Sequence, residues 1–152
     1  MSIKRITNPL EFNQLIDDLH SLFLQEDLNE GHQFLKHSPE MIKTCFSHSQ
    51  ILAWEMFVWA NKNGDSFDAA IMFANDKNPK FNTRIFSEFL WLSKNPKVGY
   101  KLFKTAVDFA KQKDFGLLAM STVVKHPKHE KIKSFYEKMG LLKDSETYIC
   151  KL

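Results

Sequence analysis

Apolar residues along this chain follow two spacings, one typical of buried strands and the other of amphipathic helices. Residues 85–92, Ile-Phe-Ser-Glu-Phe-Leu-Trp-Leu, are rich in aromatic and branched side chains and are followed by a Ser/Asn/Pro cluster, which predicts a buried strand. Apolar positions then recur at helical spacing from Val98 to Ala110 and predict a helix that begins near Tyr100. We expect the rest of the chain to be organised around this strand and helix.

The amino-terminal part predicts one short strand and two helices. Residues 2–7 are expected to form the strand. Asn8 followed by proline is typical of a helix start, and the apolar stripe after it continues to about Leu24. The polar residues 25–37 are interpreted as a connection or a loosely wound turn. Ser38, also followed by proline, marks the start of the second helix.

The middle of the chain predicts a hairpin. Two apolar runs, residues 51–61 and 67–75, are separated by a turn that contains Asn63 and Gly64. An Asn-Gly pair between two such runs is the strongest short-range signal for a β-hairpin. Beyond the organising strand and its helix, the buried run Leu117–Val123 predicts a further strand, parallel to the one at 85–92.

The carboxyl-terminal part predicts a helix up to Met139, ended by Gly140, and a last strand at Thr147–Leu152. The predicted order is therefore β-α-α-β-β-β-α-β-α-β. This order indicates an α/β fold with a mixed sheet and helices on both faces. With 152 residues, 43% of them hydrophobic, residues 1–152 are expected to form one domain with a sizeable core.

The composition restricts the compartment and the partners that we expect for this protein. No apolar run approaches the roughly 20 residues of a membrane span, and no signal-peptide core is seen at the amino end, so no membrane partner is expected. Cys45 and Cys150 lack metal-type spacing and are interpreted as buried free thiols of a reducing compartment, which predicts a cytoplasmic protein.

The net charge of +3 is unevenly distributed. Residues 1–93 contain 8 Lys/Arg and 12 Asp/Glu, whereas residues 94–152 contain 13 and 6. The basic second half indicates an anionic partner. Nucleic acid is the weaker candidate, because all but two of the 21 basic residues are Lys and Arg is the preferred reader of base edges. A small phosphorylated cofactor fits at least as well.

The junction between the organising strand and its helix is a candidate phosphate site. Gly99 lies at the expected helix start, and four lysines surround it: Lys94, Lys97, Lys101 and Lys104. Unpaired backbone N–H groups at a helix start, together with cations, suit a phosphate group. An ordinary strand-to-helix turn with solvated lysines is the alternative.

The order of elements and the heptapeptide Phe-Tyr-Glu-Lys-Met-Gly-Leu at residues 135–141 together resemble the GNAT superfamily of acetyl-CoA-dependent N-acetyltransferases. The family's last helix typically reads Phe-Tyr-Glu-Lys-x-Gly-Phe. The family's phosphate loop, Gln/Arg-x-x-Gly-x-Gly/Ala, is matched poorly. Lys94 stands at its first position, Lys97 replaces its first Gly, and only Gly99 is kept.

The resemblance implies acetyl-CoA as a co-substrate and a wedge between two parallel strands that splay apart. Backbone groups of the organising strand would pair with the pantetheine arm, N–H groups at the helix start would hold the pyrophosphate, lysines would add charge, and a histidine would contact the cofactor. The residues implied are Leu90, Trp91, Leu92, Lys94, Lys97, Val98, Gly99, Tyr100, Lys101 and His129. For His129, a surface position in the first helical turn is the alternative.

Two residues are candidates for the chemistry. Tyr136 stands where many family members place the acid that protonates the leaving thiolate, although it also lies on the apolar stripe of its own helix. Glu88 is the only acid in its predicted strand and is the candidate base, with a solvated sheet position as the alternative. Simple alternation places Glu88 on the same face as Phe86, Leu90 and Leu92.

The expected function is transfer of an acetyl group from acetyl-CoA to an amine by direct attack, with a small molecule or a peptide as acceptor. The acidic first half suggests a cationic acceptor. A catalytically inactive module of the same fold, acting in binding or structure, is the alternative, because the phosphate loop is degenerate and fold does not prove activity.

The sequence indicates no oligomeric state. His126 and His129 are spaced three apart, but no further metal ligands accompany them, so no metal is expected.

Overall fold

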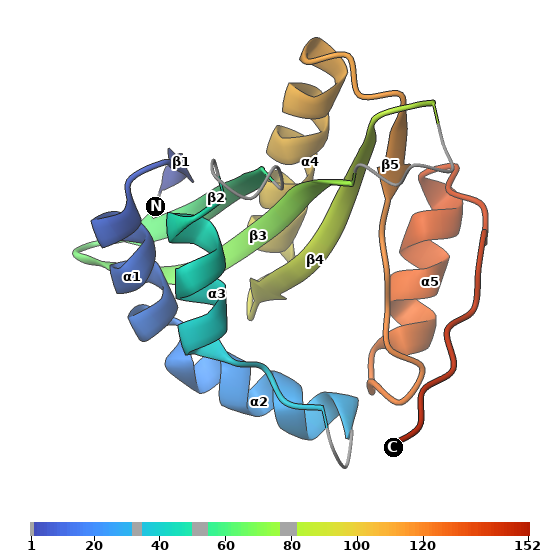
Figure 1. Ribbon diagram of the computed structural model, residues 1–152, viewed down its shortest axis with the longest axis horizontal. Helices are drawn as coiled ribbons and strands as arrows, with labels where there is room; N and C mark the ends of the chain where they lie inside the picture. Colours follow the sequence, from blue (N-terminus) through green and yellow to red (C-terminus); the bar gives the residue numbers. More distant parts are fainter. Residues whose placement is uncertain (1, 32–34, 50–54, 77–81) are drawn as a thin grey trace.

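The computed structural model describes residues 2–31, 35–49, 55–76 and 82–152. In these ranges five strands form one mixed sheet in chain order (Figure 1). The strands are β1 (Ser2–Ile6), β2 (Met56–Asn63), β3 (Ser66–Asp76), β4 (Ile85–Ser93) and β5 (Leu117–Ala119). Neighbouring strands from β1 to β4 are antiparallel, and β4 and β5 are parallel. The sheet is therefore mixed, as the sequence predicts.

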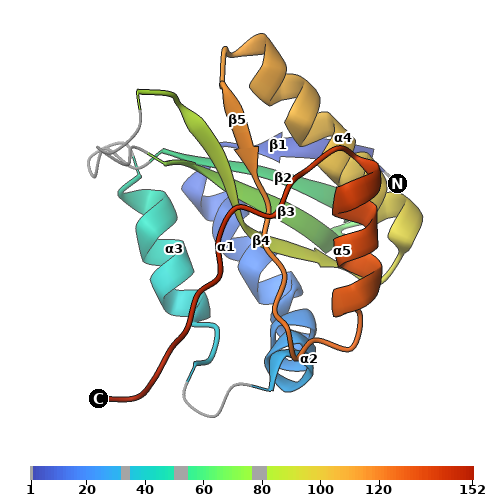
Figure 2. The ribbon, with the colours of Figure 1, turned by 90° about the vertical axis from the view of Figure 1, so that its right-hand side faces the viewer.

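Helices cover both faces of this sheet (Figures 1 and 2). They are α1 (Pro9–Asp18), α2 (His20–Glu30), α3 (Pro39–Ser47), α4 (Pro96–Gln112) and α5 (His129–Lys138). One core cluster joins α1 and α3 to the sheet and includes Phe12, Phe46 and Met72. A second cluster, beneath α4, includes Phe73 and Leu102. The sheet is thus buried on both sides, which holds its central strands in fixed register.

Several short sequence motifs adopt the structures that they predict. The side chain of Asn8 accepts hydrogen bonds from the backbone of Leu10 and Glu11 at the start of α1. Ser38 caps α3 in the same way. The hairpin between β2 and β3 turns at Gly64, whose φ of +66° lies in the left-handed region that glycine tolerates. Residues 51–54 of the first predicted hairpin strand lie outside the described residues.

The predicted connection at residues 25–37 is wrong over its first part, because α2 continues to Glu30. A single helix that ends near Leu24 was expected. The chain instead forms two helices, which are separated at Leu19. Gly31 then ends α2 with a φ of +64°. Polar residues here occupy the exposed side of a helix, so their polarity alone did not indicate a loop.

The predicted last strand at Thr147–Leu152 is absent, and the predicted strand at 117–123 is shortened to β5. The carboxyl-terminal segment forms no ladder, and Tyr148 is 86% exposed. A strand forms only where a neighbouring strand offers an edge for pairing, and β5 offers only three residues. The local sequence pattern therefore did not predict correctly whether the last strand forms. Cys150 is correspondingly exposed instead of buried, and Cys45 is half-buried; both are free thiols.

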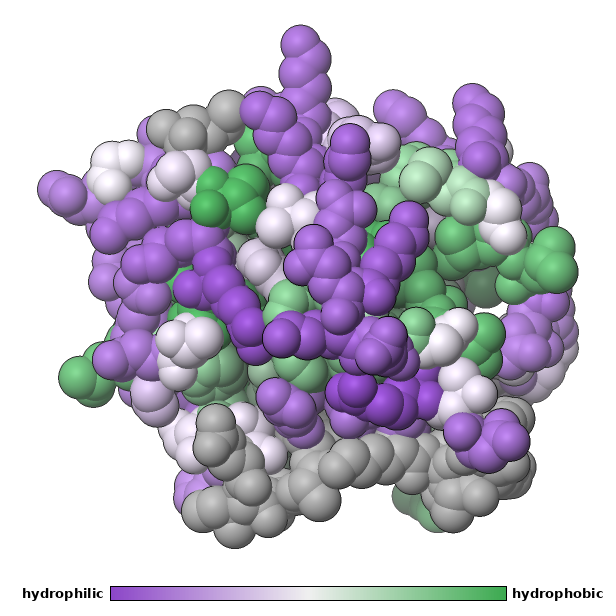
Figure 3. All heavy atoms as spheres, turned by 90° about the horizontal axis from the view of Figure 1, so that it is seen from above, coloured by the Kyte–Doolittle hydropathy of each residue, from purple (hydrophilic) through white to green (hydrophobic). Residues whose placement is uncertain are grey.

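No helix of the described residues is long and apolar enough to cross a membrane. The face seen from above is covered mainly by hydrophilic side chains, with small apolar areas among them (Figure 3).

Candidate active site

The parallel strands β4 and β5 diverge after three paired residues. Ile85 lies beside Leu117, and Ser87 beside Ala119 marks the end of the ladder. Beyond this point β4 stays paired with β3 as far as Ser93, whereas the chain after β5 has no strand structure. The expected wedge between splayed strands is therefore confirmed.

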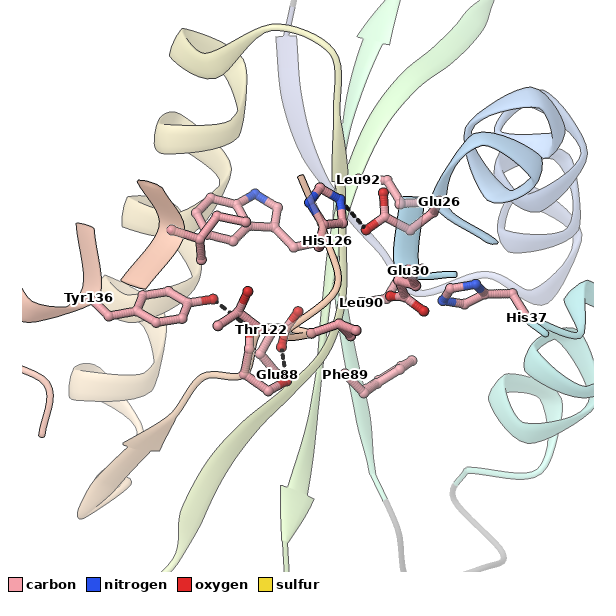
Figure 4. Close-up of a pocket in the computed structure, with 14 residues that line it drawn as sticks. Glu26, Glu30, His37, Glu88, Phe89, Leu90, Leu92, Thr122, His126 and Tyr136 are labelled. Atoms are coloured by element: carbon pink, nitrogen blue, oxygen red, sulfur yellow. Dashed lines mark hydrogen bonds and ion pairs between the residues drawn. The ribbon is translucent and has the colours of Figure 1, made fainter. Parts of the chain in front are cut away.

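A cavity lies at this divergence (Figure 4). Its wall is built by α2, by β4 beyond Ser87, by the segment after β5, by α5, and by His37 from the connection before α3. The other lining residues are Glu26, Glu30, Glu88, Phe89, Leu90, Trp91, Leu92, Ser121, Thr122, Val123, His126, Ile132 and Tyr136. Three expected cofactor residues, Leu90, Trp91 and Leu92, are among them, as are both candidate catalytic residues.

A bulge in β4 changes the expected alternation of its side chains. The ladder with β3 pairs Phe73 with Glu88 and Met72 with Leu90, so Phe89 is the extra residue. Phe86 consequently packs in the cluster beneath α4, whereas Leu90 packs in the cluster beneath α1 and α3. The prediction that Phe86, Leu90 and Leu92 share one face with Glu88 is therefore wrong, because one additional residue reverses the alternation.

Glu88 is half-buried, and its carboxylate accepts a hydrogen bond from the hydroxyl of Ser121 at 3.1 Å. Burial raises the pKa of Glu88 to about 7. The hydrogen bonds from Ser121 oppose this shift, and the nearby carboxylates of Glu26 and Glu30 add to it. A carboxyl group with this pKa is suited to accept a proton near neutral pH.

Tyr136 lies on α5 and is only 9% exposed. Its hydroxyl donates a hydrogen bond to the backbone carbonyl of Ser121 at 2.8 Å. Burial, and secondarily the charge of Glu88, raises the pKa of Tyr136. The phenol therefore stays protonated over the working pH range of an ordinary enzyme, which a proton donor requires.

The cavity also contains acidic residues that the sequence analysis did not select. Glu26 and Glu30 lie one turn apart near the end of α2, and Glu26 pairs with Nε2 of His126 at 3.1 Å. His37 also lines the cavity and pairs with Asp27 at 2.7 Å. The i, i+4 spacing of these two glutamates just before Gly31 places them on one face of a helix. This was not recognised, because the segment was interpreted as a connection.

The start of α4 differs from the expected geometry. The helix begins at Pro96, not near Tyr100, and Asn95 caps it by accepting a hydrogen bond from the N–H of Lys97. The N–H of Gly99 already bonds to the carbonyl of Asn95 at 2.9 Å. Gly99 is buried in the first turns of the helix, where an added Cβ would lie 3.4 Å from the side chain of Ser93.

The remaining expected cofactor residues surround this helix start or lie on α5. Val98 is buried, Tyr100 is 43% exposed, and the side chains of Lys94, Lys97 and Lys101 are exposed. None of these three lysines forms an ion pair within the described part of the chain.

His129 is the first residue of α5, and its Nδ1 lies 3.3 Å from the hydroxyl of Thr122. It is absent from the wall of the cavity, although Thr122 is part of it. Among residues 2–31, 35–49, 55–76 and 82–152, no group of three or more His, Cys, Asp or Glu side chains is arranged to hold a metal ion.

No protein-family model matches this chain, and no curated protein matches it. Solved structures do match. A probable acetyltransferase is 18% identical, over 100% of this chain and 97% of its own, with a TM-score of 0.65. A ribosomal-protein-alanine N-acetyltransferase from Brucella melitensis biovar Abortus 2308 is 12% identical over the whole of both chains, with a TM-score of 0.65.

A further match is an aminoglycoside acetyltransferase from an uncultured soil metagenomic sample, solved in complex with trehalose. It is 12% identical, over 99% of this chain and 95% of its own, with a TM-score of 0.67. The chain has the fold of the GNAT acetyltransferases. At these identities the comparisons establish the GNAT fold alone, so activity must be argued from the site.

Proposed function

We propose that this protein is an N-acetyltransferase that moves an acetyl group from acetyl-CoA, bound as a co-substrate, to an amine by direct attack. The observation that carries this proposal is the cavity at the divergence of β4 and β5, with Glu88 and Tyr136 both on its wall. The GNAT fold supports the same reading.

The pantetheine arm is proposed to lie along β4 at Leu90, Trp91 and Leu92. Within the described residues, the edge of β4 that faces β5 is paired only as far as Ser87, so the backbone groups beyond it face the wedge. An extended ligand can add to such an edge through main-chain hydrogen bonds. Leu90 and Leu92 are buried, so they hold the strand in place while its backbone binds.

The phosphate groups are proposed to lie at the first turns of α4, which comprise Val98, Gly99, Tyr100 and Lys101. Lys94 and Lys97 lie in the approach to this helix and would add positive charge. Because the N–H groups of Lys97 and Gly99 already have partners, side-chain charge carries more of this contact than backbone donors do. His129 would contribute a further donor from α5.

In the proposed reaction, the neutral amine attacks the thioester carbonyl while Glu88 accepts its proton, directly or through a water. A C–N bond forms and the C–S bond breaks. Tyr136 gives its proton to the departing thiolate. Glu88 then gives the proton that it holds to solvent, and solvent restores the phenol. The products are an N-acetylated amine and free CoA, and no acyl-enzyme is required.

The test is release of free CoA thiol from acetyl-CoA in the presence of a panel of primary amines. Amine-dependent release is expected, and acetylation of the amine should be confirmed by mass spectrometry. Release that does not depend on any added amine would contradict the proposal.

An inactive module is the second candidate, and a specific observation favours it: Lys97 replaces a glycine of the phosphate loop, and the N–H of Gly99 is already bonded. A thermal-shift measurement separates the two candidates. A ligand at a hundred times its dissociation constant adds about 2.7 kcal/mol to the free energy of unfolding. No shift with acetyl-CoA or CoA at millimolar concentration would favour the module.

A further inference from the structure

The two arginines of this chain, Arg5 and Arg84, line one cavity, although they are far apart in the sequence. Arg5 lies on β1, and Arg84 immediately precedes β4. We call this second cavity the arginine cavity. The other residues of its wall are Glu55, Phe57, Phe109, Lys113 and Phe115. Its volume of about 320 Å³ lies at the lower end of the roughly 300–1,000 Å³ of small-molecule sites.

The arginine cavity is separate from the proposed acetyl-CoA site. The two cavities share no described lining residue. Phe109 lies in the last turn of α4, about 20 Å along the helix from Pro96, where the phosphates of acetyl-CoA are proposed to bind. A ligand in the arginine cavity therefore would not compete with the proposed co-substrate.

Both guanidinium groups are stacked on aromatic rings. The Cζ atom of Arg5 is 4.5 Å from the ring centre of Phe109, and that of Arg84 is 4.1 Å from the ring centre of Phe115. Arg84 also donates a hydrogen bond to the backbone carbonyl of Lys113 at 2.9 Å. Stacking uses the face of a guanidinium group, so it restrains the group while its N–H edges can still donate to an anion.

Positive charge exceeds negative charge around the arginine cavity. Within the described residues, neither arginine nor Lys113 forms an ion pair. The described wall has three cationic side chains and one carboxylate, that of Glu55, which gives a net charge of +2. A phosphate monoester, with about −1.5 to −2 charges at pH 7, balances this charge more closely than a single carboxylate or sulfate does.

We propose that the arginine cavity binds a small phosphate monoester. The guanidinium groups of Arg5 and Arg84 donate hydrogen bonds to the phosphate oxygens, in the fork geometry that suits phosphate. Lys113 adds a third positive charge. The organic part of the ligand lies in the rest of the cavity, against the aromatic part of its wall.

A purely structural role for the arginines makes a different prediction. Arg5 and Arg84 could serve only to cover the rings of Phe109 and Phe115 with their side chains. In that case, replacing them would change the stability of the protein, and no phosphate ester would bind to the wild-type cavity.

The experiment is calorimetry with phenyl phosphate and with phenyl sulfate, which has the same ring and a single negative charge. Wild-type protein should bind phenyl phosphate about tenfold more tightly than phenyl sulfate. The double variant Arg5→Gln, Arg84→Gln should bind phenyl phosphate about tenfold more weakly than wild type. Lys133→Gln with Lys138→Gln, two exposed side chains outside the arginine cavity, is the control of equal charge change and should bind within about twofold of wild type.

Two further variants keep the test decisive if the double arginine variant does not fold. Lys113→Gln alters one exposed side chain of the wall and should weaken binding of phenyl phosphate about threefold. The triple change of Lys94, Lys97 and Lys101 to Gln removes charge at the proposed acetyl-CoA site and should leave this binding within about twofold. Thermal unfolding checks that each variant is folded.

The outcomes do not depend on whether the protein transfers acetyl groups. Absence of phenyl phosphate binding to wild type at millimolar concentration would overturn the proposal, as would equal binding of phenyl sulfate. Weakening by the triple lysine variant alone would place the ester at the start of α4 and overturn it too. If a ten-nucleotide single-stranded DNA bound more tightly than phenyl phosphate, and the arginines were required for this, the site would be for a nucleic acid backbone and not for a small ester.

Discussion

The hydroxyl of Tyr136 donates a hydrogen bond to the backbone carbonyl of Ser121, at 2.8 Å. The side-chain hydroxyl of Ser121 in turn donates to the carboxylate of Glu88, at 3.1 Å. The candidate acid and base therefore meet at one residue, which lies just beyond the point where β5 leaves β4. Both contacts lie at the divergence of the two strands, where the cavity also lies.

Replacing Tyr136 with Phe is expected to lower kcat by about a hundredfold, because loss of a positioned proton donor typically costs 10²–10⁴ in rate. KM for acetyl-CoA should change little. The free energy of unfolding should fall by about 1 kcal/mol, because the carbonyl of Ser121 loses its partner. Steady-state kinetics and thermal unfolding measure the two effects.

Tyr148→Phe is the matched control, since Tyr148 is 86% exposed and lies outside the cavity wall. Turnover in Tyr136→Phe as fast as in the parent protein would show that the phenol has only a packing role.

The pKa of Glu88 predicts the pH dependence of both activity and stability. As base, Glu88 must be ionised, so kcat/KM should fall as pH drops below about 7. Its pKa in the folded protein is raised, so the folded state binds the proton more tightly than the unfolded state does. Its ionisation therefore costs stability as pH rises from about 4.5 to about 7, and this cost persists above pH 7.

Glu88→Gln should accordingly have a higher Tm than the parent at pH 8, with the difference vanishing near pH 4, and it should lose most of its activity. Thermal scans at the two pH values test this, with the exposed Glu137→Gln as control. A Tm difference that is the same at both pH values would rule out ionisation of Glu88 as its cause.

Local signals predicted most of the fold, because they act within a few residues. The caps at Asn8 and Ser38 and the turn at Gly64 depend only on side chains and backbone angles next to them. The same holds for Gly140, which follows the end of α5 with a φ of +84°. The predicted strand at Thr147–Leu152 failed because a strand depends on a partner elsewhere in the chain.

The candidate site was predicted only in part. Glu88 and Tyr136 were found through a lone acid in an apolar strand and a heptapeptide motif, and both line the cavity. The sequence did not indicate a role for Ser121. Its hydroxyl contacts Glu88 and its carbonyl contacts Tyr136, and the positions of both groups depend on where β5 ends. The bulge at Phe89 has no local signature either, since it depends on the register against β3.

Gly99→Ala is expected to leave the fold intact and to raise the free energy of unfolding by about 0.5–1 kcal/mol, because alanine is the better residue inside a helix. The added Cβ would meet Ser93 and Trp91 at 3.4–3.6 Å, which is ordinary contact. Gly140→Ala is the matched opposite: a side chain there is strained by the positive φ and should cost about 1 kcal/mol. A destabilised Gly99→Ala protein in denaturant unfolding would contradict this account of the helix start.

Three exposed lysines at the start of α4 are expected to bind the phosphates of acetyl-CoA by charge. Changing Lys94, Lys97 and Lys101 together to Gln should weaken acetyl-CoA binding about tenfold, since each exposed contact is worth up to about 1 kcal/mol. Binding of a pantetheine fragment without phosphate should not change, because the wedge along β4 is untouched. The control is the triple change of Lys111, Lys133 and Lys138, which removes the same charge elsewhere. Calorimetry at low and high salt compares them. Equal weakening by both triple variants would mean that net charge, and not this helix start, attracts the cofactor.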